Sequence, residues 1–221
     1  MANKSFITLS QMETITENIL NKVQYSLSWN GTPTAVPIDE IIEFQYNLDI
    51  VWEPIDHFSH GDLVMAAILP TQRKIILNDS CKELYDEKIG TLNFTMAHEL
   101  GHWVLHVDDK LNKQTAFVFD EEQEIYYCRS FSKKPPEEFQ ADMFAGCLLM
   151  PQPILTPLIN LLKDEYQQIK FPQLYNICDI FKVTITALKV RLHTLNLLYI
   201  DKNGTIYNSK EDYTGQLTLK I

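Results

Sequence analysis

One short pattern limits what this chain can fold into more than any other feature: H-E-x-x-H at residues 98–102. The apolar spacing around it predicts a helix over residues 87–107. Residues four apart on a helix share a face, so His98 and His102 can both direct a ring nitrogen at one metal ion. Glu99 is rotated by ~100° from His98 and can reach a water molecule bound to that ion. The competing interpretation is a helix with two half-buried histidines and a solvated glutamate, and we favour the metal site.

Two carboxylates on a second predicted helix, over residues 135–150, can complete such a site. A catalytic zinc ion takes three protein ligands and leaves one position for water. Glu138 is the best candidate for the third ligand because it begins a polar stripe with Asp142, one turn later. Asp142 can accept a hydrogen bond from the second ring nitrogen of a ligating histidine. Glu137 and the acidic run at residues 120–124 fit less well, by register and by expected loop position.

These residues predict the hydrolysis of a peptide bond. The metal ion would lower the pKa of its water to ~7 and polarise the scissile carbonyl, while Glu99 would take the water proton and deliver it to the leaving amine. A hydrogen-bond donor for the oxyanion is also needed. The sequence does not choose among five candidates: Tyr126, Tyr127, Arg129, His106 and His193. We do not expect His106 to be a metal ligand, because it lies eight residues after His98, whereas the third histidine of metzincins lies ten residues after the first. If it is not the oxyanion donor, we expect it to be a supporting or structural residue.

Composition narrows the remaining function classes. The formal net charge of −10 argues against broad binding to nucleic acid or to an anionic membrane surface. The four cysteines are scattered and predict neither a disulfide framework nor a cysteine-ligated zinc site. Free thiols and the lack of a secretory leader predict a reducing, cytoplasmic location. The one long apolar run, residues 144–162, is interrupted by three prolines, so we expect no membrane span.

The N-terminal half is expected to mix helices and strands. Helices are predicted over residues 10–28, with Ser10 as N-cap, and from Pro37 through Phe44. Strands are predicted at residues 50–53, 63–69 and 74–78, the last two as a hairpin.

Gly101 weakens the motif helix by about 1 kcal/mol relative to alanine. Two reasons for it remain open: close approach of another backbone beside the metal, or simple tight packing. Beyond the motif, residues 125–129 are a candidate strand, and a core stripe is expected on the helix of residues 135–150 at Phe139, Met143, Cys147 and Met150.

The C-terminal part is expected to be mostly helical. After a helix at residues 153–166, two helices at 172–181 and 184–196 outline a helix-turn-helix, and Asn203-Gly204 marks a terminal hairpin. The tail after Ser209 is expected to be loose. The helix-turn-helix-like segment carries a weak positive balance, with Lys182, Lys189 and Arg191 against Asp179. We expect it to complete the core or dock a partner, with DNA binding as the alternative.

Several motifs, in this order, give the chain a family resemblance over residues 10–198. They lie at residues 37–41, 75–78, 94–102, 138–145, 148–151, 181–184, 187–188 and 191–192. Together they resemble the ImmA/IrrE family of metallopeptidases. The resemblance implies that His98, His102 and Glu138 bind the metal and that Glu99 is the base. Asp142 stands where asparagine is common in the family, and the spacer between His102 and Glu138 is long and acidic, so substrate specificity does not carry over.

The resemblance also implies a fold and a biological role. We expect an α+β fold: a zincin-like core at residues 1–168, with a small sheet packed on the motif helix and the Glu138 helix, then a helix-turn-helix-like segment with a terminal hairpin at residues 169–221. Family members act in the bacterial cytoplasm. Their metal ion is usually taken to be zinc, and manganese has been proposed for some of them. Several members cleave a helix-turn-helix repressor of mobile-element or stress genes. The expected function is therefore a metal-dependent endopeptidase with a protein substrate. The alternative is a DNA-binding or protein-binding regulator whose core is only a sensor or scaffold.

Overall fold

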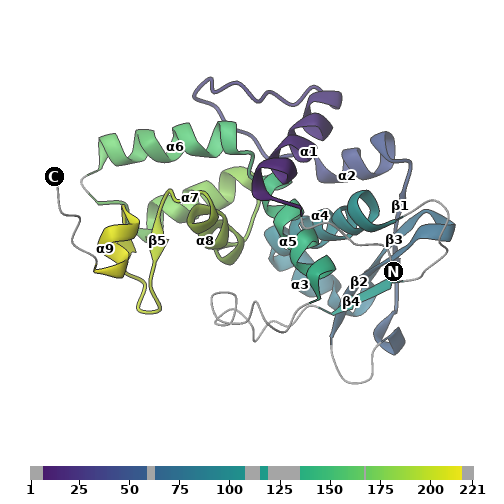
Figure 1. Cartoon of the computed structure of the whole chain (residues 1–221). Coiled ribbons are helices and arrows are strands. Elements are labelled where there is room, and N and C mark those ends of the chain that lie inside the picture. Colours follow the sequence, from purple (N-terminus) through teal and green to yellow (C-terminus); the bar gives the residue numbers. More distant parts are fainter. Residues whose placement is uncertain (1–6, 59–62, 108–114, 119–134, 167, 216–221) are drawn as a thin grey trace.

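The computed structural model describes residues 7–58, 63–107, 115–118, 135–166 and 168–215. A sheet lies at one end of the molecule, two helices cross its centre, and a group of C-terminal helices lies on the far side (Figure 1). The central helices are α4 (Ile89–His106) and α5 (Pro136–Leu149), which carry the H-E-x-x-H pattern and Glu138. The predicted α+β fold is confirmed, with the small sheet against the motif helix and the Glu138 helix beside it.

The sheet has four strands in the order β1-β3-β2-β4. They are β1 (Asp49–Glu53), β2 (Val64–Leu69), β3 (Lys74–Asn78) and β4 (Thr115–Val118). Short 3-10 turns follow the first three strands: η2 (Asp56–Phe58), η3 (Pro70–Gln72) and η4 (Asp79–Cys81). β1 is parallel to β3, whereas β2 is antiparallel to both of its neighbours, and the predicted hairpin of β2 and β3 is confirmed. β2 is buried throughout because the main core covers one face of the sheet and a smaller cluster around Ile55 covers the other.

Helix α1 (Leu9–Lys22) begins from a different cap than the predicted Ser10. Thr8 is the N-cap: its hydroxyl accepts from the Gln11 N–H, and the Gln11 side chain accepts from the Thr8 N–H at 2.9 Å. This reciprocal pair is a capping box, which places Ser10 inside the first turn. The predicted end at residue 28 is also wrong, because the chain leaves the helix and reaches a φ of 58° at Gln24.

The second predicted helix forms in two parts. α2 (Ile38–Glu40) passes into η1 (Ile41–Gln45), a π-helical segment. Pro37 precedes the first residue, where a missing N–H is tolerated. Ile41 and Ile42 are fully buried whereas Phe44 is exposed, so only one face of this segment reaches the core.

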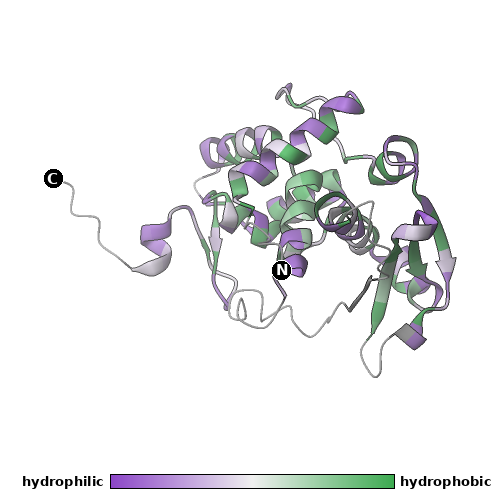
Figure 2. Cartoon of the chain, turned by 45° about the vertical axis from the view of Figure 1, so that its right-hand side comes forward, coloured by the Kyte–Doolittle hydropathy of each residue, from purple (hydrophilic) through white to green (hydrophobic). Residues whose placement is uncertain are grey.

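The helix that carries Glu138 is more deeply buried than the sequence predicted. It packs between α1, α4 and α8 (Ile185–Thr194), so apolar residues on several faces are buried. The predicted core stripe is therefore partly wrong: Cys147 and Met150 are buried, but Phe139 and Met143 are only half-buried. Figure 2 shows hydrophobic residues concentrated on the strands and inner helices.

The C-terminal part confirms the predicted helix-turn-helix outline. It consists of α6 (Gln152–Glu165), α7 (Phe171–Phe181), α8, the hairpin β5 (Tyr199–Ile200) and β6 (Ile206–Tyr207), and α9 (Lys210–Thr214). The expectation of a loose tail after Ser209 is wrong for the described residues. The Ser209 hydroxyl caps α9 by accepting from the Asp212 N–H at 3.1 Å, and Tyr213 stacks on Tyr199.

One cluster of buried apolar side chains runs through most of these elements. It extends from Met12 in α1 through Leu100 in α4 and Phe144 in α5 to Leu192 in α8 and Ile206 in β6. The C-terminal helices therefore pack on the same core as the site helices.

No single helix among the described residues is long and apolar enough to cross a membrane. Helices α5 and α6 reach the required length and apolar character only when taken together, and that pair is bent by 65°.

Candidate metal centre

Helices α4 and α5 approach closely because Gly101 has no side chain. A Cβ atom at Gly101 would lie 3.2 Å from Cα of Ala141 and 3.1 Å from Cδ1 of Phe144. Both reasons left open for this glycine therefore apply, because the Ala141 backbone comes close and the Phe144 side chain packs tightly at the same position. The approaching residue immediately precedes Asp142, so the contact brings the predicted site residues of both helices together.

His98, His102 and Glu138 converge on one point between the two helices. The Nε2 atoms of the two histidines are 3.0 Å apart, and each lies 3.4 Å from an oxygen of Glu138. Among the described residues, these three form the group whose atoms could hold a metal ion. Two donors bound to tetrahedral zinc at ~2.0–2.1 Å would lie about 3.3 Å apart. The observed separations fit this value, so the donor set suits a zinc-sized ion.

Asp142, in the second turn of α5, fixes the orientation of the His98 ring. His98 Nδ1 and Asp142 Oδ1 are 2.9 Å apart, a hydrogen-bond distance. When Nδ1–H donates this bond, the neutral ring turns its Nε2 lone pair toward the other donors. Burial lowers the pKa of His98, but hydrogen bonds to Asp142 and Glu138 outweigh burial and raise it to about 10. The two carboxylates that raise this pKa would equally stabilise a bound cation.

Glu99 is positioned on the same helix with an unsatisfied carboxylate. Its side chain is buried, and Oε2 has no hydrogen-bond partner among the described residues. Buried polar atoms are rarely left unpaired, so this oxygen indicates a partner such as water or substrate. Burial raises the pKa of Glu99 to about 8, with the charge of Glu138 adding to the effect and that of His98 opposing it. A carboxyl group with this pKa can both accept and return a proton near neutral pH.

The remaining predicted candidates have different positions. His106 Nε2 lies 3.2 Å from the carbonyl oxygen of Glu137, and its ring contacts that of His102. His193 packs edge-on against Tyr199 in the C-terminal part. The other three oxyanion candidates, the acidic run and the candidate strand lie outside the described residues: Tyr126, Tyr127, Arg129, and residues 120–124 and 125–129.

Sequence reasoning missed two residues at the start of α4. A Cβ atom at Gly90 would lie 2.5 Å from the carbonyl carbon of Val183, in the turn between α7 and α8. Asn93, one turn later, donates from Nδ2 to the Lys182 carbonyl at 3.0 Å. A glycine just inside a predicted helix was the available signal. These contacts join the motif helix directly to the helix-turn-helix-like segment.

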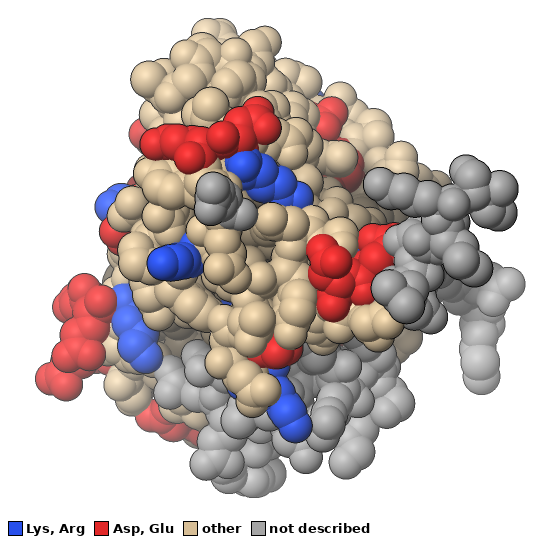
Figure 3. Space-filling view, turned by 90° about the vertical axis from the view of Figure 1, so that its left-hand side faces the viewer, with Lys and Arg blue, Asp and Glu red and all other residues tan. Residues whose placement is uncertain are grey.

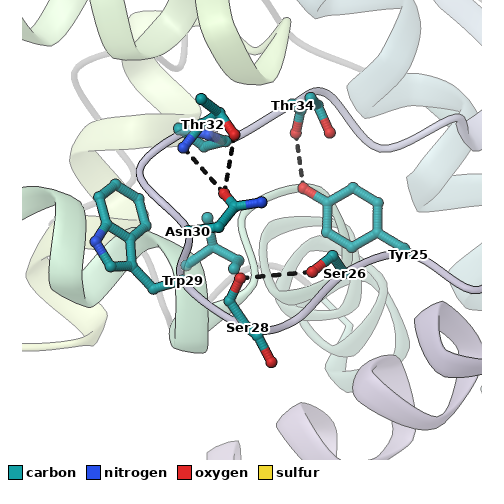
Figure 4. A pocket seen from close by; sticks show the side chains of 9 residues that line it. Tyr25, Ser26, Ser28, Trp29, Asn30, Thr32 and Thr34 are labelled. Atoms are coloured by element: carbon teal, nitrogen blue, oxygen red, sulfur yellow. Dashed lines mark hydrogen bonds between the residues drawn. The ribbon is translucent and has the colours of Figure 1, made fainter.

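A pocket elsewhere in the molecule shows no sign of being a second functional site. It has a volume of about 200 Å³ and lies in the loop after α1 (Figure 4). Its polar groups bond to one another: Asn30 Oδ1 accepts from Thr32, and the Tyr25 hydroxyl donates to the Thr34 carbonyl at 2.7 Å. These bonds shape the loop and do not indicate a ligand.

A comparison of the sequence with models of known protein families finds a match that includes these site residues. The family model described as the IrrE N-terminal-like domain, Peptidase_M78, matches residues 73–193. The match covers more than half of the chain and includes both histidines, Glu99, Glu138 and Asp142. The chain belongs to this family. The IrrE N-terminal-like match runs from β3 to α8, so it also includes the helix-turn-helix-like segment.

Two other comparisons complete this picture. No curated protein matches the chain. Among solved structures, a "Mycobacterium tuberculosis transcriptional regulator" matches with a TM-score of 0.48 and 14% identity over 88% of this chain. The chain spans 53% of the length of that structure. The assignment as a metallopeptidase-like M78 domain with a candidate metal site therefore rests on the family model and the donor geometry.

Proposed function

We propose that this M78 protein is a metal-dependent endopeptidase. The observation that carries the proposal is the convergence of His98, His102 and Glu138 beside a buried glutamate with a free oxygen. An unpaired buried carboxylate oxygen such as Glu99 Oε2 is unusual in a purely structural cluster. The same oxygen is what a peptidase needs to receive a proton from water.

The three converging side chains would hold the ion, which we expect to be zinc, with manganese as the alternative. When bound, such an ion lowers the pKa of a coordinated water to about 7 and polarises the scissile carbonyl. Asp142 keeps the proton of His98 on Nδ1, so that Nε2 remains available as a ligand. His98 and His102 come from one rigid helix and Glu138 from another, so the ligand geometry depends on how α4 and α5 pack.

Glu99 is the general base in this proposal. It takes a proton from the attacking water at Oε2 and later delivers that proton to the leaving amine. Its burial favours this exchange because the surrounding protein excludes competing solvent and raises the pKa of the carboxyl group to about 8. Glu99→Gln should therefore lose peptide cleavage while leaving the three ligands in place.

We further propose that the substrate is a protein, namely a helix-turn-helix repressor, and that the enzyme acts in the cytoplasm. Both statements come from the resemblance to the ImmA/IrrE family. The scissile bond requires an extended backbone near the base, which limits cleavage to a flexible or exposed segment of the substrate. A narrow-specificity regulatory role therefore suits the proposal better than general protein degradation.

A DNA-binding function has weaker support. Arg191, counted among its cations, is buried and paired with Glu13 at 2.6 and 2.9 Å. The turn before α8, which would lead a recognition helix into the major groove, is packed against Gly90. On the face over the C-terminal elements, Lys and Arg side chains alternate with acidic ones (Figure 3). A gel-shift screen without salt-sensitive binding would dispose of this alternative.

The first test of the metal site is metal content, measured by elemental mass spectrometry on protein purified without chelators. We expect about one metal ion per chain in the wild type and in Glu99→Gln, and a large loss in Glu138→Ala. Glu137→Ala is the matched control, because it removes a neighbouring carboxylate of the same turn that is outside the ligand group. No metal in the wild type, even after zinc or manganese is added back, would contradict the proposal.

The second test addresses cleavage. The metal-loaded enzyme is incubated with any helix-turn-helix protein encoded near its gene, and fragments are identified by intact-mass analysis. The wild type should produce a fragment that is absent with Glu99→Gln. Equal cleavage by that variant would mean that a contaminant or another residue is responsible.

A further inference from the structure

The role of His106 is not explained by the proposed reaction. It is the last residue of α4, one turn beyond His102, and the two rings pack with centroids 5.4 Å apart. It is outside the group of converging ligands. Its Nε2 atom instead lies 3.2 Å from the carbonyl oxygen of Glu137, whose next residue is Glu138.

Three histidines of α4, spaced four residues apart, meet successive points on α5. The pairs are His98 with Asp142, His102 with Glu138, and His106 with the Glu137 backbone. Residue numbers rise along one helix as they fall along the other, so α4 and α5 run antiparallel at this contact. The third histidine therefore stands opposite the beginning of α5, where it can hold the backbone itself.

The first turn of α5 begins without a side-chain N-cap. Its N-cap, Pro135, makes no side-chain hydrogen bond to the helix, and Pro136 has no backbone N–H to be bonded. Helix ends without such caps open more readily than helix interiors. Glu138 stands in this turn, so fraying would carry its carboxylate away from the two histidine ligands.

We propose that His106 is a positioning residue for Glu138. Its Nε2–H donates to the Glu137 carbonyl and holds the first turn of α5 against the end of α4. Glu138 then enters the site with its carboxylate already oriented, which strengthens metal binding without His106 touching the ion. This inference rests on the proposed metal site.

Three substitutions of His106 separate the effect of its hydrogen bond from the effect of its aromatic ring. Glutamine places an amide nitrogen close to where His106 has Nε2, asparagine is too short to reach, and alanine has no donor. The Kd for Zn²⁺, measured by competition with a chromogenic chelator, should rise about tenfold in His106→Ala and His106→Asn. In His106→Gln it should stay within about threefold of the wild type. His193→Gln is the control, since this exposed histidine contacts Tyr199 in the C-terminal part and should not alter the Kd.

Hydrogen exchange of the metal-free proteins provides a second readout. Amides of residues 136–142 should exchange faster in His106→Ala and His106→Asn, but not in His106→Gln. Unchanged exchange and unchanged Kd in His106→Ala would overturn the inference, as would a glutamine variant as weak as alanine. If the wild type bound no Zn²⁺, the proposed function would fail, while the exchange rates would still decide whether His106 holds the first turn.

Discussion

Arg191 shows at the scale of one residue how a role depends on contacts distant in sequence. In the sequence it adds positive charge to the helix-turn-helix-like segment. In the structure its guanidinium makes two hydrogen bonds to Glu13, which is 178 residues earlier, and a third to the Met150 carbonyl. No local spacing marks such a pair, so the sequence could not predict it.

Removing one partner of this buried pair should be costly. Arg191→Met or Glu13→Gln leaves a buried charged group uncompensated, so we expect the free energy of unfolding to fall by about 3–5 kcal/mol in urea titrations. The double variant Glu13→Leu with Arg191→Met removes both charges and should recover most of that loss. Lys202→Met, at an exposed position, should change stability by less than about 0.5 kcal/mol. Single variants that cost under about 1 kcal/mol would contradict this account.

At Glu99, by contrast, a substitution should increase stability and abolish function. Its carboxyl group is buried with one unpaired oxygen, so the wild type bears a desolvation cost. Because burial raises the pKa of Glu99 to about 8, folding at pH 7 requires this carboxyl group to take up a proton. Glu99→Gln removes that cost and should raise the free energy of unfolding of the metal-free protein by about 1–2 kcal/mol while abolishing cleavage. Glu83→Gln, an exposed control in α3 (Lys82–Glu87), should leave both unchanged. An inactive variant that is also less stable would indicate a structural role for Glu99.

At the scale of elements, local signals explain what could be predicted. The i, i+4 histidines and the Glu138–Asp142 stripe each lie on one helix, so their faces follow from spacing alone, and the donor group has the predicted members. The cap of α1 is also visible in the sequence as Thr8-x-x-Gln11, a capping-box pattern that is a stronger signal than the predicted cap at Ser10. What could not be predicted depends on packing between elements: the His106 contact, the clamp of Asn93 on the α7–α8 turn, and burial around α5.

The spacing between α4 and α5 can be tested at Gly101. Gly101→Val would push its side chain into Ala141 and Phe144, so we expect a loss of about 1–3 kcal/mol in unfolding free energy. Separation of the helices should also weaken Zn²⁺ binding about tenfold, because Glu138 moves away from the histidines. Gly146→Ala is the matched control within α5. Among the described residues its Cβ would meet only Arg191 Cδ, at 3.9 Å, and the helix should gain about 1 kcal/mol. Unchanged Zn²⁺ affinity in Gly101→Val would show that the site does not depend on this contact.

At the scale of the whole molecule, the helix-turn-helix-like segment is built into the protein rather than appended to it. Leu174, Phe181, Leu188 and Leu192 belong to the same buried cluster as the site helices. The turn between α7 and α8 also lies against Gly90 at the start of α4. The predicted division at residues 168/169 stays a prediction, and these contacts give it a sharp test.

A fragment of residues 1–168 should fail to fold cooperatively. It would expose the part of the core that the C-terminal helices cover and would leave Glu13 buried without Arg191, and both losses act on α1 and α5. We expect weak near-ultraviolet circular dichroism, no sigmoidal urea transition and no stoichiometric Zn²⁺ binding. A fragment of residues 1–209 is the control: it lacks only α9 and the residues after it, and α9 has no buried residue, so it should unfold cooperatively and bind Zn²⁺. If the shorter fragment also folded and bound the ion, the boundary would separate two independent domains, and the C-terminal helices would be free for another role.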